Sequence, residues 1–192
     1  MKSSTYQLST RFEGQWKDAY VPYYARRFAR VLSGPEAADI IAQATGSPYP
    51  LTEYGENLTY VKELTDPNSL RGGGSPEAKD MFAFMLAFYQ AERTMPPVNK
   101  DLASPVQAMS MMSSPMVARR VSADGKNRVA YLLKSDKSQD EMIEELYLAS
   151  LSRKPTAGEV EVAKRLMVQD RTKGTENLQW ALLNSTEFLV NH

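Results

Sequence analysis

Apolar residues recur at helical spacing along most of this chain, most clearly in its last third. Ser138 is followed three residues later by Glu141, and Thr156 is followed at the same distance by Glu159. This spacing is typical of a capping box, in which each side chain bonds the backbone N–H of the other residue. Apolar stripes follow both boxes: Met142, Ile143, Leu146, Tyr147 and Leu151, then Val160, Ala163, Leu166 and Met167. The sequence therefore predicts two helices here.

A serine followed by a nearby proline marks further helix starts in the first two thirds. The pattern occurs at residues 33–35, 75–76, 104–105 and 114–115, and proline is favoured at the first helical position. We expect the first of these helices to end at Gly46, as a left-handed cap. Residues 81–89 are apolar on nearly all sides, which predicts a central buried helix. The next two helices carry these apolar residues at helical spacing: Val106, Met109 and Met112, then Met116, Val117 and Val121.

Glycine and proline punctuate the remaining segments. Residues 47–75 are rich in both, which predicts a long loop, and residues 127–134 predict a short helix. Gly174 is expected to end the helix that begins after Thr156, and a last helix then leads to a turn at 186–190. The first 33 residues lack a clean period and predict a loop followed by an extended or short helical piece.

The predicted fold class is all-α. No alternating run exceeds about four residues, so no substantial strand is expected. We expect an irregular multi-helix bundle of about 7–9 helices with a long loop near residues 47–75. Residues 1–192 are expected to form a single helical domain.

Composition narrows the classes of function. The chain has 192 residues, with 23 Lys and Arg against 23 Asp and Glu, one His and no Cys. Zero net charge argues against a domain that mainly neutralises nucleic-acid phosphates or coats an anionic membrane. The lack of cysteine excludes thiol catalysis, Cys-ligated zinc, iron–sulfur clusters and covalent c-type haem on this chain. No stretch approaches the ~18 apolar residues of a transmembrane helix, so membrane insertion is not expected.

Rings and positive charges alternate in one segment near the start of the sequence. Its members are Tyr20, Tyr23, Tyr24, Arg26, Arg27, Phe28 and Arg30. Aromatic rings stack on sugars or bases, and arginines pair with anions. The segment is therefore a candidate ligand or partner surface, with internal packing and ion pairs, a glycan or protein surface, and nucleic acid as alternatives.

Arg71 is a second candidate, because it precedes a Gly72–Gly74 run and a helix start. Backbone N–H groups at a helix start can hold an anion. The run lacks the Gly-Lys-Ser/Thr of a P-loop. A flexible surface loop explains the same residues.

Three other features carry candidate chemistry, and each has a structural explanation. His192 is the only histidine, so a Ser-His-Asp hydrolase is nearly excluded. Glu141, Glu144 and Glu145 lie on one predicted helix face, where a solvated surface competes with acid–base chemistry. The ten methionines include four within residues 109–116. They favour core filling, with a partner groove or a copper site as alternatives.

Several stretches together resemble a known family. The longest are DEMIEELYLASLSRKPT at 140–156 and LQWALLNSTEFLVNH at 178–192. Shorter ones stand in the same order: STYQLS at 4–9, ADIIAQATG at 38–46 and QAMSMMSSPMV at 107–117. In combination they resemble the planctomycete-specific C-terminal domain family called domain of unknown function 1553. The chain departs from the family at AFYQAER, residues 87–93, where members often carry Phe-Gly-Arg followed by more arginine.

The resemblance implies a context rather than a reaction. Such domains usually end long extracytoplasmic proteins, behind a signal peptide and often a planctomycete-type cytochrome c domain. By resemblance, the chain is a C-terminal fragment of a longer multidomain protein, periplasmic or otherwise extracytoplasmic. We expect no cofactor on this chain; haem would lie elsewhere in the full-length protein.

Two functions stay open at this point. We expect a non-catalytic helical domain that packs on neighbouring domains of the same protein and binds a glycan or protein partner, and not nucleic acid. The alternative is part of an enzyme that acts on polysaccharide or with a redox partner, its site completed by a missing N-terminal region.

Overall fold

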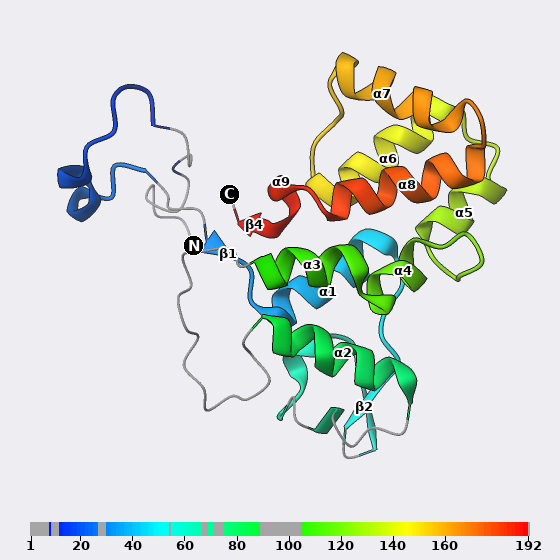
Figure 1. The fold of residues 1–192 in the computed structure, drawn as a ribbon, viewed down its shortest axis with the longest axis horizontal. Helices are drawn as coiled ribbons and strands as arrows, with labels where there is room; N and C mark the ends of the chain where they lie inside the picture. Colours follow the sequence, from blue (N-terminus) through cyan, green and yellow to red (C-terminus); the bar gives the residue numbers. More distant parts are fainter. Residues whose placement is uncertain are drawn as a thin grey trace.

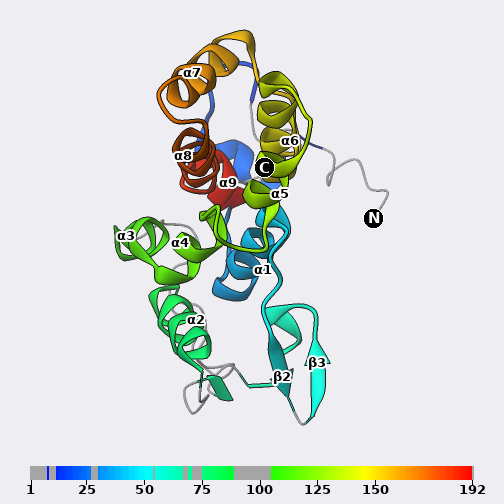
Figure 2. The same ribbon diagram turned by 90° about the vertical axis from the view of Figure 1, so that its right-hand side faces the viewer.

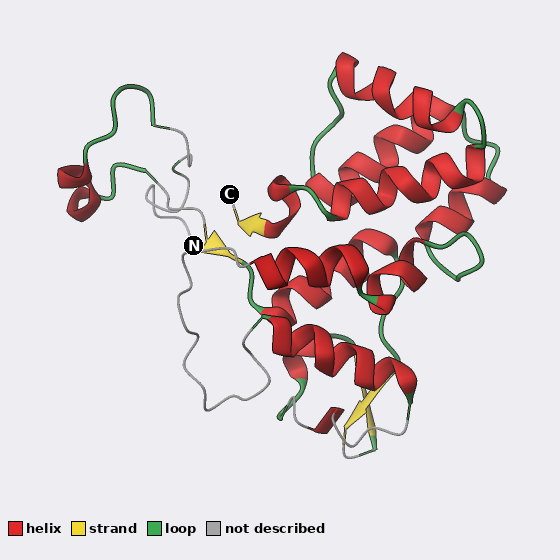
Figure 3. Ribbon diagram, viewed as in Figure 1, coloured by secondary structure: helices red, strands yellow, loops and turns green. Residues whose placement is uncertain are grey.

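Helices make up most of the chain in the computed structural model, which describes residues 8, 12–26, 30–53, 55–66, 69–70, 75–88 and 105–191 (Figure 1; Figure 3). The α-helices are α1 (Gly34–Thr45), α2 (Pro76–Ala87), α3 (Pro105–Ser113), α4 (Pro115–Val121), α5 (Arg128–Lys134), α6 (Gln139–Leu151), α7 (Ala157–Met167), α8 (Arg171–Leu183) and α9 (Thr186–Leu189). The other elements are the 3-10 helices η2 (Asp18–Tyr23) and η3 (Val61–Glu63) and the strands β1 (Arg30–Val31), β2 (Leu51–Glu53), β3 (Glu56–Leu58) and β4 (Val190–Asn191). The predicted all-α fold class is confirmed.

Side-chain caps fix the helix starts where the sequence predicts them. Ser33 accepts the backbone N–H of Glu36, whose carboxylate accepts the N–H of Ser33 at 2.9 Å. The two predicted capping boxes at the starts of α6 and α7 are also present. Gly46 ends α1 in the left-handed conformation, with φ of 61°. These local contacts satisfy N–H and C=O groups that have no partner within the helix.

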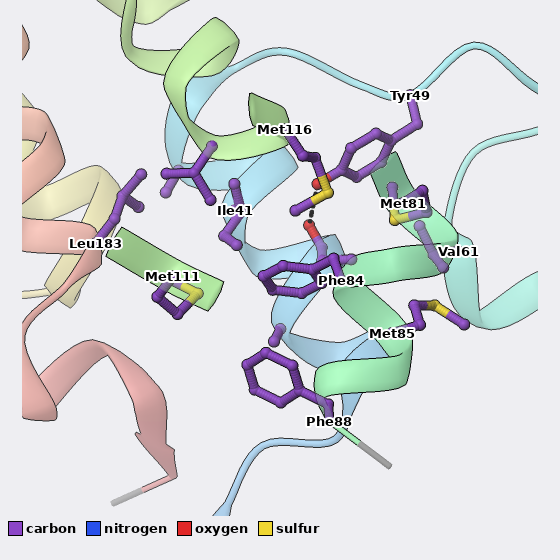
Figure 4. Packing of buried hydrophobic residues seen from close by; sticks show 14 of the residues in the cluster. Ile41, Tyr49, Val61, Met81, Phe84, Met85, Phe88, Met111, Met116 and Leu183 are labelled. Carbon is purple, nitrogen blue, oxygen red and sulfur yellow. Dashed lines mark hydrogen bonds between the residues drawn. The ribbon is translucent and has the colours of Figure 1, made fainter. Parts of the chain in front are cut away.

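Two hydrophobic clusters form the interior. The first gathers side chains mainly from α1, the segment between α1 and α2, α2 and α4, and Figure 4 shows Phe84 of α2 and its cap residue Phe88 within it. The second lies among α5, α6, α7 and α8 and includes Met142, Ile143 and Leu146. Leu151 packs against both clusters. The end of α8 also reaches the first cluster, since Leu183 belongs to it (Figure 4).

The segment between α1 and α2 is more regular than the predicted long loop. Strands β2 and β3 pair antiparallel as a hairpin, with Leu51 opposite Leu58. Figure 2 shows this hairpin at the end of the molecule away from α7. The carboxylate of Asp39 in α1 accepts the N–H of Val61 at 2.6 Å and so ties η3 to α1. Local composition predicts a loop, but these contacts with α1 order the segment.

The prediction that Gly174 ends a helix is wrong, because Gly174 lies inside α8. Helix α7 already ends at Met167, and α8 begins after the cap residue Asp170. A Cβ built on Gly174 would lie 2.4 Å from the carbonyl oxygen of Leu166. The glycine therefore permits α8 to approach the end of α7 closely.

The apolar faces of α2 and α3 also differ from expectation. Helix α2 buries Met81, Phe84 and Met85 but exposes Leu86, so it covers one side of the core rather than running through it. In α3, Met111 is the buried methionine. The predicted stripe of Val106, Met109 and Met112 is exposed instead.

The start of the helical body pairs with its end. Strand β1 lies antiparallel to β4, with Val31 opposite Val190, and the N–H of Leu32 donates to the carbonyl of Leu189. The predicted turn at 186–190 is confirmed as α9 followed by β4. Among the described residues, no helix has both the length and the apolar character needed to cross a membrane.

Candidate functional site

The candidate ligand or partner surface predicted around Tyr20, Tyr23 and Tyr24 rests on a small cluster of aromatic rings. The rings of Phe12, Trp16 and Tyr20 pack together with centroids 5.3–5.9 Å apart. The guanidinium of Arg26 lies 4.0 Å from the centroid of the Trp16 ring. These contacts are the size and geometry of ordinary aromatic and cation–π packing. The cluster therefore gives η2 a small packed base of its own.

Two tyrosines on this base face solvent. Tyr23 is 79% exposed and Tyr24 is 66% exposed. Tyr24 caps the end of η2 with φ of 49°, so it turns the chain at that point. Figure 1 shows η2 standing apart from the helices of the main body. Tyr23 and Tyr24 together are called the tyrosine surface below.

Of the other residues predicted for the ligand or partner surface, Arg27 and Arg71 lie outside the described residues. The single histidine, His192, which is a separate candidate, also lies outside them. Arg30 belongs to β1, where its backbone pairs with Asn191, and its side chain lies outside the description. The structure thus joins Tyr20 and Arg26 to the supporting ring cluster and leaves Tyr23 and Tyr24 as the exposed rings.

A pocket of about 240 Å³ lies where the end of α1 meets α5 and α6. We call it the α5 pocket; its lining residues are Gly46, Lys126, Asn127, Arg128, Tyr131 and Glu145. Gly46 is the cap of α1, and its left-handed backbone turns the chain beside Arg128. Asn127 caps α5 and accepts the N–H of Ala130 at 2.9 Å. Local capping chemistry therefore shapes two walls of the pocket.

Arg128 is held in place by three hydrogen bonds. Its Nε donates to the carbonyl of Ala44 at 2.8 Å, and one terminal nitrogen donates to the carbonyl of Gln43 at 3.4 Å. The other terminal nitrogen donates to Glu145 at 3.1 Å. The carbonyls at the end of α1 have no partner within the helix, and a cation there is favourable. Arg128 therefore fastens α5 and α6 to the end of α1.

Glu145 stays ionised in this setting. Partial burial favours its neutral form, but hydrogen bonds and charge from Lys137 and Arg128 outweigh burial and lower the pKa of Glu145 below its usual value. Lys137 donates to the carboxylate oxygen that Arg128 leaves unbonded. Both oxygens of Glu145 are thus engaged, which suits an anchoring role better than proton transfer.

The other two acidic side chains of this helix face also have separate partners. Glu141 belongs to the capping box with Ser138, and hydrogen bonds from Ser138 lower its pKa. Glu144 pairs with Lys154 at 2.7 Å. The three carboxylates therefore do not converge on one point, and the interpretation as a charged outer face fits their contacts.

Two arginines hold distant segments together. Arg120 is only 2% exposed, donates to Glu77 at 2.8 Å, and lies 3.7 Å from the ring centroid of Tyr49. Arg153 donates to both Glu159 and Glu187. Hydrogen bonds from Arg153, followed by Thr156, lower the pKa of Glu159 to about 2. These contacts join α4 to α2 and the end of α6 to α7 and α9.

The α5 pocket is not predicted by the sequence. Lys126 and Tyr131 have no unusual neighbours along the sequence, and Glu145 stands out only as part of an acidic helix face. The one local signal is the Asn127 cap, which predicts the start of α5 but no ligand. The pocket arises from packing between residues that are far apart in the chain.

In the described ranges, no group of three or more His, Cys, Asp or Glu side chains could hold a metal ion. Met109 and Met112 are exposed on α3, whereas Met111 and Met116 are buried. Core filling is therefore correct for two of these four methionines. A partner groove on α3 stays a prediction.

Comparison with known proteins gives one result about descent. A family model described as PSD1, protein of unknown function (DUF1553), matches residues 1–167. No match is found among curated proteins or among solved structures. The matched range includes the ring cluster, extends to the end of α7 and contains every residue that lines the α5 pocket. The resemblance inferred from the sequence motifs is confirmed: the chain belongs to the PSD1 (DUF1553) family of proteins of unknown function.

Proposed function

We propose that this chain is a non-catalytic helical domain of a longer extracytoplasmic protein. It packs on neighbouring domains of the same protein, and its tyrosine surface binds a glycan or protein partner. The extracytoplasmic location rests on the family resemblance alone. The alternative, part of an enzyme that acts on polysaccharide or with a redox partner, is an outcome of the test below.

The observation that carries the proposal is the exposure of Tyr23 and Tyr24 on a prepared support. A partner that covers these rings would gain free energy, because full burial of a phenylalanine-sized side chain is worth about 1.5–3 kcal/mol. Tyrosine is enriched at binding surfaces, since it offers a rigid ring and a hydroxyl at low entropic cost. The packed rings of Phe12, Trp16 and Tyr20 fix the segment that presents them.

The charged residues support a structural role for the remainder of the domain. Glu145 is held by Lys137 and Arg128, and Glu159 is held by Arg153; these contacts lower the pKa values of both carboxylates. A general acid at neutral pH needs a raised pKa instead. These two carboxylates therefore suit a structural role, in which they hold helices together, better than a catalytic one.

Thermal unfolding tests the proposal. The chain would be melted with a panel of oligosaccharides and with the separately produced upstream part of the same protein. A partner at about 100 times its Kd stabilises the folded state by about 2.7 kcal/mol, which raises Tm by about 5–10 °C in a domain of this size. The double variant Tyr23→Ser/Tyr24→Ser should lose this shift.

A matched control is Val168→Ser, which removes a similarly exposed apolar side chain beyond the end of α7. It should leave the shift unchanged. A shift that survives in the tyrosine variant would contradict the proposed surface. Turnover of a polysaccharide from the panel, measured as new reducing ends, would contradict the non-catalytic assignment and favour the enzyme alternative.

A further inference from the structure

We infer that the α5 pocket binds one sugar residue that carries an anionic group, either a carboxylate or a sulfate ester. The inference deepens the proposed function, because a glycan is one of the partners proposed there. It uses residues that the tyrosine surface does not share. The two can therefore fail separately.

The cations of the pocket favour an anion. Lys126 is exposed and has no ion pair among the described residues, and Arg128 shares its only carboxylate partner, Glu145, with Lys137. Glu145 is the one acidic side chain in the lining. Positive charge therefore exceeds negative charge at the pocket, whereas the whole chain is neutral.

Arg128 presents donors that are already oriented. Its guanidinium has five N–H groups, and three of them are used by Ala44, Gln43 and Glu145. The side chain is still 26% exposed. The two remaining N–H groups, on the terminal nitrogens, can bond a carboxylate or sulfate. Because the three existing bonds fix the guanidinium, little entropy is lost when the anion binds.

Tyr131 supplies the surface for a sugar ring. It is 62% exposed and lines the same pocket as Lys126 and Arg128. An exposed aromatic face packs on the apolar face of a sugar, and its hydroxyl can bond a sugar hydroxyl. An inorganic anion would pair with Lys126 and Arg128 but would make no stacking contact with the Tyr131 ring.

The size of the pocket limits the ligand. Its volume of about 240 Å³ is below the roughly 300–1,000 Å³ of sites for drug-sized molecules. One ring with its charged substituent fits such a space, while the rest of a glycan chain would continue into solvent. The pocket is thus suited to one acidic unit within a longer glycan.

Nuclear magnetic resonance titration of the whole chain tests this inference. Four probes would be added separately: trigalacturonate, galactose 6-sulfate, neutral maltotriose and inorganic sulfate. We expect saturable shifts of the amides of residues 126–131 and 145 with one or both of the acidic sugars. The arm that binds identifies the source of the anionic group, a carboxylate or a sulfate ester.

Two variants locate the site on exposed residues that hold no other part of the fold. Lys126→Gln removes a cation that has no ion pair among the described residues, and Tyr131→Ala removes the ring; each should weaken acidic-sugar binding about tenfold. Lys79→Gln, another exposed lysine, and Tyr23→Ser are the matched controls and should bind as the parent chain does. Loss of binding in Tyr23→Ser alone would place the glycan on the tyrosine surface and overturn the inference.

Other results would overturn it as well. Maltotriose binding as strongly as trigalacturonate would remove the role of the anion. Inorganic sulfate binding as strongly as galactose 6-sulfate would remove the role of the ring. Absence of amide shifts at millimolar concentrations of all four probes would exclude the site, while leaving the tyrosine surface to its own test.

Discussion

Replacing Gly174 by alanine tests the close approach of α7 and α8. The added Cβ would lie 2.4 Å from the carbonyl oxygen of Leu166 and 2.6 Å from the Cα of Met167. Both neighbours are backbone atoms, so no side-chain rotation relieves the contact. The helices must separate by several tenths of an ångström or the last turn of α7 must change.

Two effects of opposite sign decide the outcome. In an exposed helix interior, alanine is more favourable than glycine by about 0.8–1 kcal/mol. Overpacking a tight contact costs typically about 1–3 kcal/mol and sometimes more. Since the contact here is with backbone, the upper part of that range applies, and we expect a net loss of about 1–2 kcal/mol. In a domain of this size such a loss lowers Tm by about 2–8 °C.

Urea unfolding followed by circular dichroism measures the change, with Gly158→Ala as the control. Gly158 lies in the first turn of α7, and a Cβ there would meet nothing within 4 Å. That variant should be neutral or more stable by about 0.4–1 kcal/mol, because it reduces the freedom of the unfolded chain. A Gly174→Ala protein as stable as its parent would refute the packing argument.

Three further substitutions test the buried Arg120–Glu77 ion pair, the Ser138 helix cap and the Glu159 carboxylate. Arg120→Ala should destabilise the chain by about 3 kcal/mol in urea unfolding, because it deletes a buried cation bonded to Glu77. Ser138→Ala should cost about 1 kcal/mol through loss of the cap of α6, and an unchanged urea midpoint would count against the box. The depressed pKa of Glu159, about 2 against 4.5, contributes stability that is complete above pH 4.5 and is lost as the pH falls towards 2. Glu159→Gln should therefore lower stability at neutral pH and flatten its dependence on pH in that interval; parallel curves for the two proteins would contradict this.

Helix boundaries were predictable because they depend on neighbours in sequence. Ser138 and Glu141 bond each other across one helical turn, so three-residue spacing is enough to identify the start of α6. The same holds for Gly46, whose left-handed conformation needs no distant contact. The all-α class follows from such signals added along the chain.

The errors concern contacts between distant segments. Gly174 resembles a helix end in sequence, but its role is set by the backbone of Leu166. Met109, Met111 and Met112 are equally apolar, and the sequence cannot tell which of them faces α2 and α4. Only the packing of α3 shows that Met111 is the buried one.

The two candidate sites differ in the same way: one depends on residues close in sequence, the other on contacts between distant segments. The tyrosine surface lies within a short stretch, so alternating rings and charges made Tyr23 and Tyr24 visible in the sequence. The α5 pocket brings Gly46 to residues 126–131 and to Glu145. Those segments meet through the packing of α1 against α5 and α6, and Arg128 fastens them by bonding the carbonyl of Ala44, a residue 84 positions away.

The position of the α5 pocket links binding there to the stability of the fold. Its walls come from α1, which belongs to the first hydrophobic cluster, and from α5 and α6, which belong to the second. Arg128 crosses this boundary. An anion bound to Arg128 and Lys126 would contact both sides, so separating the clusters would first require its release. A ligand of this pocket should therefore raise the free energy of unfolding of both clusters together, and not of α5 alone.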